Sequence, residues 1–126
     1  MKNFRQFDAG PDPFGRTFHV LFKWMQTAIS LRHADTVDVK FILVDENGER
    51  TPKTVALEHS DLLYSAKETG RKIDDPWCSR LAAMHLIHLV ETGEDMEKDL
   101  VTVTRADLKA YASSLAEAEH AAVRAG

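Results

Sequence analysis

The sequence DPWCSRLAAMHLIHLVETG, residues 75–93, decides the fold of this chain. Asp75 can cap a helix by accepting a backbone N–H, and Pro76 suits the first helical position because its missing donor is not needed there. Gly93 can adopt the left-handed conformation that ends a helix. Between these signals, apolar residues occur on nearly every side, so the helix needs cover all round. The stretch therefore predicts a central helix over 75–93.

The chain on either side of the central helix predicts two more helices. One is expected over 60–70, where Gly70 ends a segment with apolar side chains on one face. The other is expected over 104–124 and begins at Thr104, whose hydroxyl precedes a carboxylate by three residues, as in a capping box. Residues 100–103 are apolar and β-branched, which indicates a short additional strand.

The first half of the chain predicts a three-stranded antiparallel meander, with strands over 17–31, 36–45 and 49–57. In the middle strand, apolar residues alternate with Asp38 and Lys40, which indicates one buried face. Strands followed by helices are typical of an α+β domain. We therefore expect an α+β fold in which the central helix packs on the meander.

An Asn-Gly pair marks the turn between the second and third strands, and the length of the loop sets their register. A two-residue loop would turn the apolar side chains of the third strand onto the polar face of its neighbour. A three-residue loop, with Gly48 in the left-handed conformation, instead pairs Val37 with Leu57 and Val39 with Val55. A slip of one residue moves a whole strand face between core and solvent, so we expect the three-residue loop.

The segment 17–31 fits two interpretations. Phe18, Phe22 and Met25 fit a helical period, whereas Phe18, Phe22 and Trp24 fit the two-residue period of a strand. The segment is rich in β-branched and aromatic residues, and it lacks a capping box at its start. We therefore expect a strand.

The register of the first hairpin decides where the rings of this strand lie. If Leu31 opposes Val37, then Phe18, Phe22 and Trp24 all lie on the face of the sheet opposite the helices. Contiguous exposed apolar surface usually marks an interface. The sequence therefore predicts self-association through these three side chains, as a homodimer, because two-fold dimers are the commonest oligomers.

The first sixteen residues predict an irregular aromatic arm, because two glycines and two prolines interrupt them. Phe4, Phe7 and Phe14 are spread among these breakers, which indicates an arm held against the body or against a partner. We therefore divide the chain into an arm over 1–16 and a single α+β domain over 17–126.

Three residues of the central helix are candidates for chemistry. His85 and His88 are neighbours at a spacing of three and are candidate metal ligands, but a site needs three or four ligands. Cys78 lies in the first turn, where helix N–H groups can lower the pKa of a thiol. A His33–Asp35 pair in the first hairpin turn has no nucleophile placed beside it by sequence. Packing or turn formation is the favoured role of all five residues.

Bulk properties exclude several classes of protein. The 126 residues carry a net charge of −4; residues 1–44 hold six basic and four acidic side chains, and residues 45–126 hold ten basic and sixteen acidic ones. Neither half has the basic footprint of a dedicated nucleic-acid binder. A single cysteine excludes an internal disulfide, and we find no signal peptide and no apolar run long enough for a membrane span. We expect a cytoplasmic, bacterial-type domain.

No catalytic motif, phosphate-binding loop or dinucleotide fingerprint occurs, and the sequence implies no cofactor and identifies no small-molecule ligand. We therefore predict a small protein-interaction domain that self-associates, and a non-enzyme rather than an enzyme. The first alternative is a metal-binding or cysteine-dependent enzyme that uses Cys78, His85 and His88. The second is a single-stranded nucleic-acid binder that stacks bases on the aromatic sheet.

Overall fold

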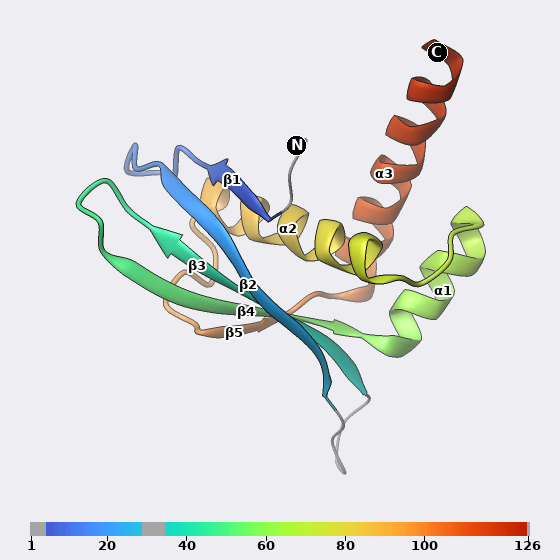
Figure 1. The fold of residues 1–126 in the computed structure, drawn as a ribbon, viewed down its shortest axis with the longest axis horizontal. Helices are drawn as coiled ribbons and strands as arrows, with labels where there is room; N and C mark the ends of the chain where they lie inside the picture. The colour runs from blue at the N-terminus through green and yellow to red at the C-terminus, as the bar shows by residue number, and fades with distance from the viewer. Residues whose placement is uncertain (1–4, 29–34, 126) are drawn as a thin grey trace.

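The computed structural model describes residues 5–28 and 35–125, which form one sheet with three helices on the same side of it (Figure 1). The α+β class expected from the order of elements is confirmed. In chain order the elements are β1 (Gln6–Ala9), β2 (Phe18–Ala28), β3 (Thr36–Val44), β4 (Arg50–Glu58), α1 (His59–Thr69), α2 (Asp75–Thr92), β5 (Leu100–Thr102) and α3 (Arg105–Ala125).

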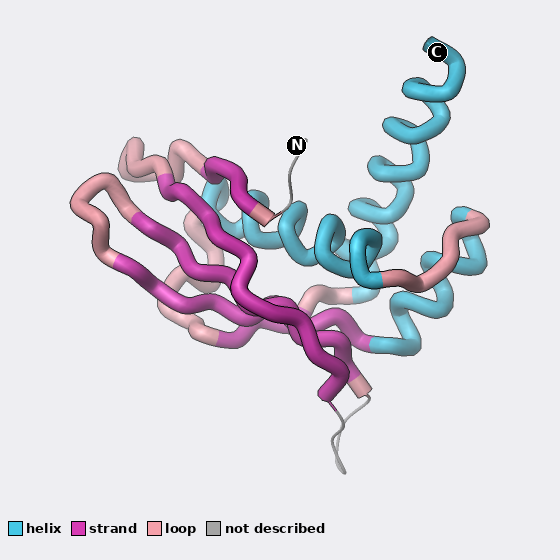
Figure 2. Tube along the Cα trace, in the orientation of Figure 1, coloured by secondary structure: helices cyan, strands magenta, loops and turns pink. Residues whose placement is uncertain are grey.

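The sheet is larger than the predicted meander. Its strand order is β1-β2-β3-β4-β5, with β1 to β4 antiparallel and β5 parallel to β4. Figure 2 shows the strands in magenta as one layer, with the helices in cyan beside it. The predicted three strands form its centre, and one short strand is added at each edge. The strand anticipated near residue 100 is parallel because α1 and α2 carry the chain back across the sheet before β5 begins.

The predicted irregular arm over 1–16 is wrong for Gln6–Ala9, which forms β1 and pairs with the start of β2. The reason is a short alternation, since Phe7 and Ala9 are buried while the residues beside them are exposed. Phe14, in contrast, is exposed, with the Arg16 guanidinium 5.5 Å from its ring centroid. Phe4 lies outside the described residues.

The second hairpin has the predicted register. Val37 pairs with Leu57, and Val39 pairs with Val55. Gly48 has a φ of 81°, the left-handed conformation that the three-residue loop requires. The apolar match across two strands was therefore sufficient to choose the loop.

The predicted register of the first hairpin is wrong. Val37 pairs with Thr27, four residues before the Leu31 that we expected. Leu31 itself lies outside the described residues, as do Ile29 and His33. The error arose because no glycine or proline marks this turn in the sequence, so its position was inferred from apolar matching alone.

A bulge in β2 has a larger effect on the fold. Phe22 pairs with Phe41 and Trp24 pairs with Lys40, so Lys23 is an extra residue with no partner of its own on β3. An extra residue in one strand shifts the alternation of all side chains that follow it. Phe22 therefore faces the helices, with its ring edge-on to Phe41 at 6.2 Å, while Trp24 faces away from them.

The predicted aromatic face is wrong because of this bulge. We expected Phe18, Phe22 and Trp24 to lie together on the side opposite the helices. Phe18 is 8% exposed and belongs to the core, and Phe22 packs against the core. Of the three rings, Trp24 alone lies on the outer face, because simple alternation holds only up to the bulge.

The central helix α2 has the predicted limits, with one correction at its start. The capping side chain is Asp74 rather than Asp75, and it accepts a hydrogen bond from the backbone N–H of Trp77 at 2.9 Å. At the other end, Gly93 has a φ of 76° and its N–H donates to the carbonyl of Leu89 at 2.8 Å. Between these two caps, α2 lies across the inner face of the sheet (Figure 1).

The core lies between α2 and that inner face. The largest fully buried apolar side chains come from both layers and from the flanking helices: Trp77, Phe41, Leu43, Leu57, Leu62, Leu81, Leu86, Leu89 and Leu108.

None of the helices that the structure describes combines the length and apolar character needed to cross a bilayer.

A buried lysine ties the loop between α2 and β5 to the sheet. Lys53 lies on the inner face of β4, and its Nζ donates to the backbone carbonyls of Asp95 at 2.6 Å and Lys98 at 2.8 Å. Burial lowers the pKa of Lys53, although nearby carboxylates oppose that effect. The stem of the side chain packs in the core while its head satisfies two carbonyls that a loop would otherwise direct to water.

Candidate functional site

The outer face of the sheet, turned away from the helices, carries a strip of apolar side chains. Residues paired across neighbouring strands lie on the same face. Leu21 pairs with Ile42, and Ile42 pairs with Pro52, so these three form one row across β2, β3 and β4. Leu21 and Ile42 are only half-buried, and Pro52 is exposed.

A second row lies beside the first. Trp24 pairs with Lys40, Lys40 with Thr54, and Thr54 with Leu100 at the β5 edge. Leu100 is 57% exposed, which is high for a leucine in a strand. We call the five apolar side chains of the two rows the outer strip: Leu21, Trp24, Ile42, Pro52 and Leu100.

Charged groups of both signs lie on or beside the outer strip. The Lys40 ammonium is 5.8 Å from the centre of the Trp24 ring, a cation–π contact. Asp38 lies two residues before Lys40, on the same face of β3, and accepts a hydrogen bond from the hydroxyl of Thr36 at 2.9 Å. Lys40 and Thr54 therefore lie inside the strip, between Trp24 and Leu100, and Asp38 adds an anion on the same face of β3.

The two helical histidines are neighbours, as predicted, but their contacts are with other groups. His85 is 5% exposed, and its Nδ1 forms a 2.8 Å hydrogen bond with the Tyr111 hydroxyl. Its ring stacks on His88 at 6.3 Å, and His88 Nε2 lies 3.8 Å from a Glu94 carboxylate oxygen. Burial lowers the pKa of His85 and raises that of Tyr111 to about 12. The hydrogen bond between His85 and Tyr111 joins α2 to α3, and both of these side chains are neutral near pH 7.

Although Glu94 lies near His88, the described residues do not gather these side chains into a metal site. Within residues 5–28 and 35–125, no group of three or more His, Cys, Asp or Glu side chains is close enough to hold a metal ion. The metal role of His85 and His88 therefore remains a prediction that geometry does not support further.

Cys78 is buried at the other end of α2. It is 3% exposed, and burial, helped by the charges of Asp75 and Asp74, raises its pKa to about 12. We considered that the helix N-terminus would lower the pKa of this thiol. Desolvation and two carboxylates have the opposite effect, so the thiolate, which is the reactive form, is a minor species of Cys78 at neutral pH.

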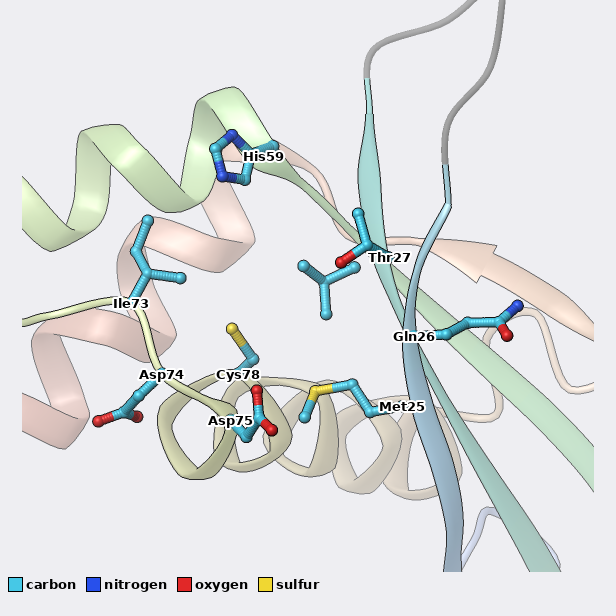
Figure 3. A pocket seen from close by; sticks show the side chains of 9 residues that line it. Met25, Gln26, Thr27, His59, Ile73, Asp74, Asp75 and Cys78 are labelled. Carbon is cyan, nitrogen blue, oxygen red and sulfur yellow. The ribbon is translucent and has the colours of Figure 1, made fainter.

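Cys78 lines a cleft of about 390 Å³ between the end of the sheet and the first turns of α1 and α2 (Figure 3). No local pattern in the sequence marks this cleft, because its walls come from β2, β3, α1, the segment that leads into α2 and the start of α2 itself. The residues that line it are Met25, Gln26, Thr27, Val37, His59, Ile73, Asp74, Asp75 and Cys78.

Comparison of the chain with protein-family models, with curated proteins and with solved structures found no significant match. Function is therefore argued from the surfaces and clefts of this chain alone. Two features have the size and chemistry for recognition: the outer strip on one side of the sheet and the Cys78 cleft at the end of the other side.

Proposed function

We propose that this chain is a small protein-interaction domain that pairs with a second copy of itself through the outer strip. The observation that carries the proposal is the bulge at Lys23, which places Trp24 beside Leu21 and Ile42 on the face that the helices leave bare. Bulky apolar side chains gathered on one uncovered face are typical of an interface. As the sole cysteine is a free thiol, we place this domain in a reducing compartment such as the cytoplasm.

The charges favour a second copy over an unrelated partner. In a two-fold interface, residue i of one copy meets residue j of the other, and j meets i. Lys40 and Asp38 are two residues apart on β3, so an antiparallel crossing of two β3 strands would set each ammonium against the carboxylate of the other copy. The strip is thus complementary to itself in charge as well as in polarity.

The edges of the sheet favour face-to-face rather than edge-to-edge pairing. The two edge strands, β1 and β5, contain four and three residues. Short edge strands offer few backbone hydrogen bonds to an added strand, and the part of the β2 edge that β1 leaves uncovered begins at the bulge around Lys23, which interrupts regular pairing. Two sheets packed face to face lie about 10 Å apart, which leaves room for side chains such as Trp24 and Leu100 to interdigitate.

The test is the molar mass in solution, measured by size-exclusion chromatography with light scattering over a range of concentrations. We expect the wild-type chain to run as a dimer and Trp24→Asp as a monomer. The matched control is Leu63→Asp, which adds the same charge at an exposed leucine of α1, on the helix side of the sheet. Circular dichroism verifies that each variant is folded.

Two results would contradict this function. One is a wild-type chain that stays monomeric at millimolar concentration. The other is a loss of dimer in Leu63→Asp equal to that in Trp24→Asp, because the interface would then lie elsewhere.

The two alternatives have less support. A cysteine-dependent or metal-dependent reaction needs a reactive thiol or a third ligand, and Cys78 is protonated while the described residues offer His85 and His88 no further ligand. Nucleic-acid binding needs a cationic surface, whereas Asp38 offsets Lys40 beside the strip and the chain is acidic overall.

A further inference from the structure

We propose that the Cys78 cleft binds a small organic cation, an ammonium group carried on a short apolar chain. This site is separate from the outer strip, since the cleft opens between the inner side of the sheet end and the helices (Figure 3). The two proposals therefore stand or fall independently.

The size of the cleft fits a small molecule. Its volume of about 390 Å³ lies within the range of about 300–1,000 Å³ for ligand pockets. Met25, Val37 and Ile73 supply apolar walls from β2, β3 and the segment before α2. An alkyl chain of several carbons would cover these walls and exclude water from them.

The charge of the cleft selects a cation. Asp74 and Asp75 line it, and none of its described lining residues is Lys or Arg. Asp74 already caps α2 through the N–H of Trp77. Asp75 is exposed at the rim, and Figure 3 shows its carboxylate on the side of the cleft where the sulfur atoms of Cys78 and Met25 lie. Arg5 lines a smaller neighbouring cleft together with Asp75, with its guanidinium 5.5 Å from the Phe22 ring.

A buried thiol points into the same space. Cys78 is 3% exposed, and Figure 3 shows its Sγ directed towards the middle of the cleft. Among the described residues, none hydrogen-bonds this thiol. Burial raises the pKa of this thiol, and the nearby carboxylates of Asp75 and Asp74 add to that effect. His59 lies across the cleft from Asp75 and supplies a second group able to accept an N–H.

Cys78 also provides the test, because it is the only cysteine of the chain. The probes are three alkyl methanethiosulfonates of similar size: aminoethyl, which is cationic, ethyl, which is neutral, and sulfonatoethyl, which is anionic. In each case the thiol loses its proton to solvent, its sulfur forms a disulfide with the alkylthio group, and methanesulfinate leaves. Mass spectrometry follows the rate, and each rate is divided by that of the same reagent with a free thiol.

We expect the normalised rate for the cationic reagent to exceed that for the anionic one by about tenfold, because the carboxylates of Asp75 and Asp74 attract the first reagent and repel the second. Asp75→Asn should reduce this preference, and Asp75→Glu should keep it. The matched control is Glu46→Gln, which removes one exposed carboxylate from the turn between β3 and β4. Equal normalised rates, no reaction with any reagent, or a preference unchanged in Asp75→Asn would overturn the proposal.

Reversible binding is tested with n-hexylammonium, with hexanol and hexanoate as matched controls. Hexylammonium should slow the modification of Cys78 by the neutral reagent in a saturable way, and Asp75→Asn should weaken this protection by about tenfold. Equal protection by hexanol would show an apolar pocket without selectivity for cations, and protection by hexanoate would reverse the sign of the site. Either result would overturn the inference.

Discussion

The two faces of the sheet are built from the same strands and differ in what covers them. On β3, Val39, Phe41 and Leu43 point to the inner face and are buried, whereas Lys40 and Ile42, between them, point to the outer face and are half-buried. All three helices lie on the inner side (Figure 1). The comparison teaches that hydrophobic residues alone do not reveal which face of this sheet is the core, since both faces carry them.

The strongest way to break this comparison is to truncate neighbouring residues on opposite faces. Phe41 is fully buried, with edge-on contacts to Phe7 at 6.0 Å and Phe22 at 6.2 Å. Phe41→Ala should lower the free energy of unfolding by about 3–5 kcal/mol. Ile42→Ala should cost less than about 1 kcal/mol when measured by urea unfolding at a concentration that keeps the chain monomeric. Similar costs at both positions would contradict the assignment of the faces.

Lys53 on the inner face and Lys40 on the outer face allow a second comparison of the two faces. Lys53→Met leaves the carbonyls of Asp95 and Lys98 without their donor, so we expect a loss of about 2 kcal/mol in the free energy of unfolding. Lys40→Met, on the outer face, is the control and should change stability by less than about 0.5 kcal/mol. Chemical denaturation measures both. A stable Lys53→Met variant would show that water replaces the ammonium at no cost.

The buried histidine predicts how stability depends on pH. The pKa of His85 is lowered by burial, so the unfolded chain binds a proton more readily than the folded one. Stability should therefore fall as the pH falls through the unfolded value near 6.5, by at most about 1.4 kcal/mol per pH unit, and level off once His85 is protonated in the folded state. His85→Gln should flatten this part of the profile. Equal profiles for the wild-type chain and this variant would contradict the prediction.

The smallest expected effect sharpens the account of the outer face. Asp38→Lys and Lys40→Asp each place like charges opposite each other in the proposed two-fold pairing, so each should weaken dimerisation by about three- to fivefold. The double exchange restores opposite charges and should recover most of the affinity. Sedimentation equilibrium at low and high salt measures these constants. Additive losses in the double variant would indicate that the two side chains do not meet across the interface.

Local signals in the sequence were sufficient for the elements and for one hairpin. Asp74–Pro76 and Gly93 bracket α2 because capping depends on a few neighbouring residues, and the cap itself was misplaced by only one position. The β3–β4 register was predictable because a glycine at the turn and apolar residues on both strands lead to the same answer. The partner of Val37 on β2 was not predictable, since no such turn signal constrains that hairpin.

The candidate sites show the same division. The sequence identified Trp24 as a surface residue but grouped it with Phe18 and Phe22, which pack in the core. It identified His85 and His88 as neighbours, and their spacing on one helix was enough for that. The Cys78 cleft was missed because its residues lie up to 53 positions apart and meet only when β2 and the start of α2 come together.

By itself, therefore, the sequence determined the three helices, the three central strands and the α+β class, because backbone conformation and periodicity follow from residues close together in the chain. The tertiary structure alone decided which side of β2 is inside, that Gln6–Ala9 joins the sheet, and that a cleft opens above Cys78. The first of these depends on the bulge at Lys23, whose position is set by pairing with a strand more than a dozen residues away, and the other two depend on contacts between segments far apart in the chain. A single extra residue at Lys23 reverses the faces of everything that follows it in the strand.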